Sequence, residues 1–103
     1  MATVSVIYPR AADAHFDFDY YTQTHLPLVE ARWGDAGLQG VQAFRGVVGP
    51  DGAEPAYFLI ALVGFASAEA LAGALGGPHA AEIIGDIPNF TSVQPVIQVN
   101  QAL

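Results

Sequence analysis

The sequence contains no cysteine and no lysine among its 103 residues. Without cysteine there is no disulfide, no thiolate metal site and no cysteine nucleophile. The only arginines are Arg10, Arg32 and Arg45. The chain has ten acidic residues, so its net charge is −7. Nucleic acids and anionic membrane surfaces are bound by clustered cations, so neither is an expected partner.

Several functional motifs are also missing. The histidines at positions 15, 25 and 79 lack the spacings of common metal sites. There is no nucleophile-elbow serine, no phosphate loop and no nucleotide fingerprint. We therefore expect no metal and no tightly bound cofactor. The N-terminus does not resemble a signal peptide and no window approaches the roughly 20 apolar residues of a membrane span, so a cytoplasmic location is the default prediction.

What the chain has in excess is apolar residues, which make up 52% of it, against 13% charged residues. Its length predicts a single domain spanning residues 1–103. A domain of this size buries about 65% of its unfolded surface, which is enough for one core. The apolar excess therefore favours a homo-oligomer, in which a second copy covers the surplus.

Hydrophobic periodicity predicts the element order β-α-β-β-α-β, which is the ferredoxin-like pattern of an α+β protein. Two helices should cover one face of a four-stranded antiparallel sheet. The third strand is apolar on both faces, so a second copy of the sheet is expected on the other side, as a dimeric barrel. The predicted strands are 3–9, 37–49, 56–65 and 92–99. The first helix is expected to be capped by Asp17 or Asp19 and to end near 33, and the second to span 67–77 with Ser67 as its cap. Residues 78–90 are expected to be a broken turn and loop.

The first predicted helix places a histidine and a proline close together. At 100° per residue His25 lies in the apolar stripe and Pro27 lies on the solvent side. Because proline cannot donate to the preceding turn, the helix should bend near Leu26 and leave room beside the imidazole. His25 is then either a structural histidine bonded to a buried carbonyl or a neutral imidazole that lines a pocket as general acid or base. The stripe around it contains Phe18, Tyr21, Leu28, Val29 and Arg32.

Three segments resemble the EthD family, named for ethyl tert-butyl ether degradation, of the dimeric α+β barrel superfamily. They are "VSVIYP", "FDFDYYTQTHLPLV" and "DIPNFTSVQPVIQV". The resemblance implies a homodimer joined through sheet faces, with a ligand pocket between the helices and the sheet of each monomer. Members of the superfamily include cofactor-independent monooxygenases, haem-degrading enzymes, lactone isomerases and polyketide cyclases or dehydratases. Fold alone does not select among these activities.

The resemblance makes His25 the catalytic candidate. Asp86 could orient the imidazole or cap the adjoining turn, and the capping role is favoured. Trp33 could close the pocket or anchor the end of its helix. The predicted substrate-binding residues are Tyr8, Phe18, Tyr21, Trp33, Phe65, Asp86, Asn89 and Phe90.

These features predict an enzyme without a cofactor, of the oxygenase or cyclase/dehydratase type, that acts on a small aromatic or polyketide-like compound. Two alternatives remain open: a haem- or hydrophobe-binding module, and a non-enzymatic accessory protein in which His25 and Pro27 serve packing only. The shortage of cations for haem propionates weighs against haem.

Overall fold

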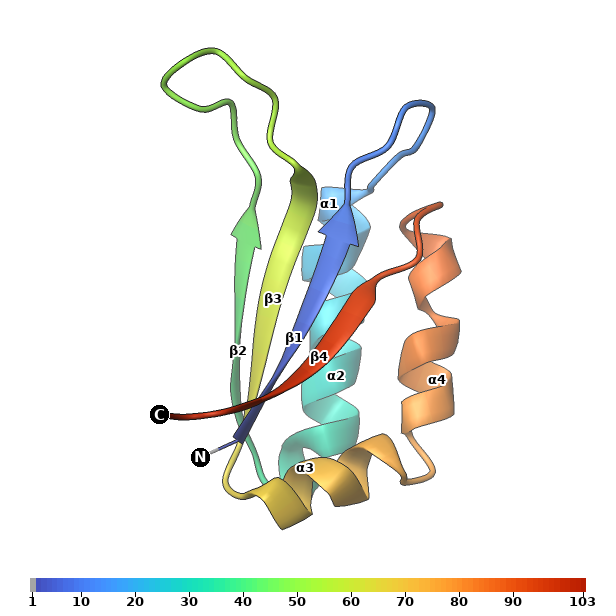
Figure 1. Ribbon diagram of the computed structural model, residues 1–103. Helices are drawn as coiled ribbons and strands as arrows, with labels where there is room; N and C mark the ends of the chain where they lie inside the picture. Colours follow the sequence, from blue (N-terminus) through green and yellow to red (C-terminus); the bar gives the residue numbers. More distant parts are fainter. Residues whose placement is uncertain (1) are drawn as a thin grey trace.

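A four-stranded antiparallel sheet forms one layer of the computed structural model, which describes residues 2–103. Its strands are β1 (Ala2–Pro9), β2 (Leu38–Arg45), β3 (Tyr57–Phe65) and β4 (Val96–Gln101), arranged in the order β2-β3-β1-β4. The helices lie together on one side of it (Figure 1). The α+β ferredoxin-like fold predicted from the sequence is thus confirmed.

The two flanking strands differ in length and position from the prediction. β2 ends at Arg45 rather than continuing to 49, and an irregularity between Leu38 and Gly40 disturbs its pairing with β3. β4 begins at Val96 rather than 92, directly after a proline that has no N–H to donate to the ladder. Both differences lie at edge strands, where pairing on one side only leaves the boundary to local residues.

The first crossover is a single rod that contains three kinds of helical turn. It comprises α1 (Phe18–Tyr20), a π-helical turn (Tyr21–His25) and α2 (Leu26–Trp33), followed by a short 3-10 turn (Gly34–Ala36). Asp17 caps the rod through a side-chain oxygen that accepts from a backbone N–H of the first turn, as expected of an N-terminal carboxylate.

The second crossover has more helix than the sequence predicted. Ser67 caps α3 (Ala68–Leu75) as expected. The segment 78–90, predicted to be a broken turn and loop, instead forms α4 (Ala80–Gly85) and a 3-10 turn (Ile87–Asn89). Proline and glycine punctuate this segment and concealed the helix. Its buried residues Ala80, Ile83 and Ile87 nevertheless follow helical spacing.

The elements of the helical layer take different positions on the sheet. α3 crosses the end of the sheet where β1 begins, and α4 runs beside α2 (Figure 1). An ion pair between Arg32 Nε and Glu82 Oε1, 2.7 Å long, joins α2 to α4 at the surface. The prediction had placed Arg32 in the apolar stripe, but its side chain faces solvent, and Trp33 takes the inward position.

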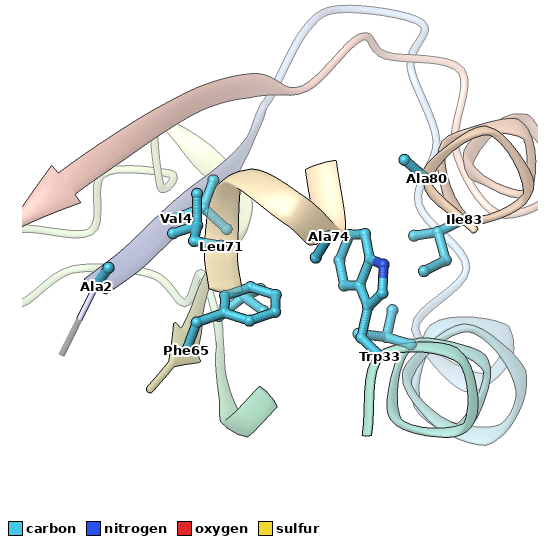
Figure 2. Close-up of a cluster of buried hydrophobic side chains, with 10 residues drawn as sticks. Ala2, Val4, Trp33, Phe65, Leu71, Ala74, Ala80 and Ile83 are labelled. Atoms are coloured by element: carbon cyan, nitrogen blue, oxygen red, sulfur yellow. The ribbon is translucent and has the colours of Figure 1, made fainter. Parts of the chain in front are cut away.

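The core between the layers consists of two clusters. One gathers around Trp33 and Phe65, whose rings meet edge to face with centroids 5.7 Å apart (Figure 2). The other is aromatic and gathers around Tyr8, Tyr21 and Phe90. The register of β1 with β3 turns alternate residues of both strands toward these clusters.

The opposite face of the sheet has no helix over it (Figure 1). Strand alternation places Ile60 and Leu62 of β3 on this face, and both are only partly buried. Phe44 of β2 and Val96 of β4 are each 54% exposed there. Among residues 2–103, no helix combines the length and apolar character needed to cross a bilayer.

Candidate functional site

His25 is the last residue of the π-helical turn and is only 5% exposed. The turn is closed by the backbone N–H of Leu26, which donates to the carbonyl of Tyr21 five residues earlier. A π turn absorbs one extra residue before Pro27, so the proline enters the first turn of α2, where its missing N–H costs little. The predicted inward histidine and outward proline are both observed, and a π turn replaces the predicted bend.

The imidazole of His25 is held by Asp86, which follows α4 in the chain. Nδ1 lies 2.9 Å from Oδ2 of Asp86. The other oxygen, Oδ1, accepts 2.6 Å from the hydroxyl of Tyr20 and 2.9 Å from the side-chain amide of Asn89. The carboxylate makes no side-chain cap, so the favoured capping role of Asp86 was wrong and the orienting role is the one observed.

The protonation states follow from burial and these contacts. Burial lowers the pKa of His25, and the hydrogen bond and charge of Asp86 offset only part of that effect. Burial raises the pKa of Asp86, but donors from Tyr20, Asn89 and His25 bring it below its usual value. Asp86 is therefore an ionised acceptor, which requires the proton of a neutral imidazole to sit on Nδ1. Nε2 is left with its lone pair free to act as a base.

An apolar cavity lies beside His25, between the sheet and the helical layer. The centre of a water molecule can occupy about 60 Å³ of it, several times the roughly 10–15 Å³ that one enclosed water needs. The polar side chains in its wall are those of Tyr8, Tyr21, His25 and Trp33. The rest of the wall is aliphatic: Val4, Val6, Leu26, Val29, Val41, Ala61, Val63, Leu75, Ile83, Ile84, Ile87 and Ile97.

Burial also determines the state of the two tyrosines in the wall. It raises the pKa of Tyr8 and of Tyr21 far above the usual value, and for Tyr8 the neighbouring Tyr21 adds to the effect. Both hydroxyls therefore stay protonated and can donate to a ligand oxygen. The ring of Tyr21 stacks on that of His25, with centroids 5.4 Å apart.

The structure divides the predicted site residues into three groups. His25, Tyr8, Tyr21 and Trp33 line the cavity. Asp86 and Asn89 form the hydrogen-bond network behind the imidazole, outside the wall. The remaining three lie outside the cavity lining: Phe90 packs on His25 with centroids 4.7 Å apart, Phe65 packs behind Trp33, and Phe18 lies under the guanidinium of Arg45.

Sequence reasoning missed Tyr20 and most of the aliphatic wall. On an α-helix Tyr20 and His25 would point in different directions, whereas the π turn between them lets both reach Asp86. The π turn itself had a signal, a proline within a strongly helical segment. The wall residues from α4, such as Ile83, were missed because that helix was predicted to be a loop.

The cavity does not fit haem. No arginine is part of its wall, so the two propionates would find no cation there. Within residues 2–103, no three histidine, aspartate or glutamate side chains lie close enough together to hold a metal ion.

A four-stranded antiparallel sheet with helices on one face and a cavity between its layers defines a protein of the α+β ferredoxin-like class. Comparison with solved structures identifies the family. An EthD-like protein from Ralstonia eutropha JMP134 is 37% identical, with a TM-score of 0.87, over 97% of this chain and 89% of that one. The chain therefore belongs to the EthD-like family of the dimeric α+β barrel superfamily.

Two further structures agree in fold. An ethyl tert-butyl ether degradation (EthD) family protein from Bacillus halodurans C-125 is 22% identical, with a TM-score of 0.76, over 100% of this chain and 99% of that one. SnoaB from Streptomyces nogalater, a cofactor-independent oxygenase, is 11% identical, with a TM-score of 0.62, over 99% and 94%. No family model and no curated protein sequence matches the chain.

Proposed function

We propose that this protein is a cofactor-independent enzyme that removes a proton from a small, neutral aromatic or polyketide-like compound. The observation that carries the proposal is the neutral His25, oriented by Asp86, at the wall of an otherwise apolar cavity. Buried bases with a fixed tautomer are typical of general acid–base sites. The fold also supports cofactor-independent oxygenation in SnoaB, although that likeness concerns the fold alone.

In the proposed reaction Nε2 of His25 takes a proton from a phenol or from a carbon next to a carbonyl. The resulting imidazolium is stabilised by the carboxylate of Asp86, 2.9 Å from Nδ1. Tyr8 or Tyr21 donates a hydrogen bond to the oxygen on which negative charge develops. The anion then either reacts with oxygen or closes a ring with loss of water. Both outcomes begin with the same proton transfer.

The second copy of the chain completes the proposal. The uncovered sheet face exposes part of Ile60, Leu62, Phe44 and Val96. Covering these side chains with the equivalent face of another copy removes apolar surface from water, which stabilises a dimer. The helices and the cavity lie on the opposite side of the sheet, so the cavity stays available in such a dimer.

The test compares His25→Gln with His15→Gln against a panel of phenols and 1,3-diketones, following oxygen uptake and product formation. His15 is exposed and lies outside the cavity wall, so its replacement is a matched control. Loss of a general base costs about 10²–10⁴-fold in rate. Equal turnover by the two variants on every converted compound would refute the mechanism. Binding of these compounds without turnover by the wild type would instead identify a hydrophobic-ligand carrier.

A further inference from the structure

The indole N–H of Trp33 is buried and has no acceptor. Trp33 is 5% exposed, and Nε1 is the one fully buried side-chain nitrogen or oxygen without a hydrogen-bond partner among the described residues. Leaving such a donor unpaired costs free energy comparable to a lost hydrogen bond, so each case needs an explanation. The edge-to-face contact with Phe65 fixes the ring position but gives the N–H no partner.

The unpaired N–H lies at the edge of the cavity, and neighbouring side chains cover it, so a ligand oxygen reaches Nε1 only when an adjacent side chain such as that of Ile83 shifts. Trp33 and Ile83 both line the cavity, and the indole nitrogen lies on the ring edge that faces Ile83 (Figure 2). His25 and Trp33 lie eight residues apart in the helical rod, which separates their backbones by about 12 Å along the axis. The cavity therefore has a base toward one end and an unused donor toward the other.

The surroundings of Trp33 determine what could accept this hydrogen bond. The residues that share its core cluster and the cavity wall are aliphatic, among them Val4, Val29, Val63 and Ile83. An enclosed water needs two to four polar partners and would find one here. An oxygen that is bonded to an apolar molecule needs only the one donor, and the molecule's own carbon skeleton suits the aliphatic wall. With no cation in the wall, the oxygen should be uncharged.

We propose that Trp33 Nε1–H is the recognition donor for a neutral acceptor oxygen, a ketone or ester carbonyl, on the ligand whose acidic proton faces His25. This inference rests on the proposed function in taking the cavity as the ligand site. It adds a specificity rule: the ligand carries an acceptor oxygen remote from the proton that is removed. A hydrocarbon of the same shape leaves the indole unpaired and binds more weakly.

The test uses the fact that Trp33 is the only tryptophan in the chain. Protein labelled with ¹⁵N gives one indole N–H resonance, which is followed during titration with acetophenone and with α-methylstyrene. These probes have the same shape and differ by a carbonyl oxygen in place of a CH₂ group. We expect acetophenone to move the indole proton downfield and to bind about tenfold more tightly, while α-methylstyrene causes no downfield shift.

Two variants locate the donor. Trp33→Phe, followed through the ligand signals, should bind both probes equally, whereas Tyr57→Phe, at an exposed position outside the cavity wall, should keep the preference for acetophenone. Equal affinities in the wild-type protein without a downfield shift would overturn the inference, as would no binding of either probe up to its solubility. Should Trp33→Phe fail to fold, the wild-type indole shift decides.

The outcomes separate this inference from the proposed chemistry. An indole shift with acetophenone, together with turnover that does not depend on His25, refutes the chemistry and leaves the donor role standing. Turnover that depends on His25, together with equal binding of both probes, refutes the donor role alone.

Discussion

Filling the cavity from the sheet side should make the protein more stable and less able to bind a ligand. Ala61 is the residue to change, because it lies in the central strand β3, is 2% exposed and lines the cavity. Replacing it by valine adds two methyl groups at a position where a β-branched residue suits the strand. The added groups enter space already enclosed by the wall.

The expected gain follows from the burial of those groups. Each buried CH₂-sized group contributes about 0.8 kcal/mol, so two give at most about 1.6 kcal/mol. Imperfect fit to the cavity reduces this, and we expect the free energy of unfolding to rise by about 1 kcal/mol. The same groups occupy volume that a ligand needs, so affinity for acetophenone should fall at least about tenfold.

Urea denaturation followed by Trp33 fluorescence measures the stability, and titration with acetophenone measures the binding. The control is Ala43→Val, which makes the same substitution on the paired strand β2 at an exposed position. It should change neither quantity by more than a small β-propensity effect. Destabilisation of Ala61→Val by 1 kcal/mol or more would mean overpacking, and would show that the side chain of residue 61 meets no open space.

The other predictions concern the histidine, the backbone and the assembly. Asp86→Asn should lower the pKa of His25 further, because the effect of burial is then unopposed. The control Asp19→Asn removes the same charge from an exposed position and should leave the NMR titration of His25 unchanged. A raised pKa of His25 in Asp86→Asn would contradict the role given to Asp86. Since the folded protein favours neutral His25, the stability that this group contributes is complete above pH 6.5 and is lost as pH falls through its lowered folded-state pKa. Urea unfolding at several pH values should therefore show that acidification lowers the free energy of unfolding less in His25→Gln than in the wild type. Gly37→Ala should cost about 1–2 kcal/mol, since Gly37 has φ +94° and a Cβ there would lie 2.9 Å from a neighbouring Cβ, whereas Gly34→Ala has open space and should not destabilise. Light scattering at micromolar concentration should give a mass near twice 10.8 kDa, and a monomer would refute the dimer proposal.

Local patterns in the sequence were sufficient for the framework of the fold. Alternation predicted β1 as a strand, apolar residues on both faces predicted β3 as a central strand, and capping residues such as Ser67 marked where helices begin. Helical periodicity placed His25 inside and Pro27 outside without knowledge of any partner. These features depend on neighbours within a few residues, and the sequence states those neighbours directly.

The site itself depends on contacts between distant parts of the chain. His25 and Asp86 are separated by 61 positions, and only the packing of α4 beside α2 brings them to 2.9 Å. The sequence offered Asp86 two roles and favoured capping, which was wrong, because an aspartate at the start of a turn suits a cap whether or not a distant histidine packs against it. The π turn added Tyr20 to the same network by changing which residues share a face of the rod.

By itself the sequence determined the order of the elements, the ferredoxin-like class, the resemblance to the EthD family and the inward position of one histidine. Only the tertiary structure decided that this histidine is held by a carboxylate, that an apolar cavity lies beside it and that the N–H of Trp33 has no partner. The physical reason is that periodicity records which side of an element is buried. What a buried group meets there depends on the chain that packs against it, and for His25 that partner is Asp86, directly after α4, a helix concealed by the glycines and prolines that flank it.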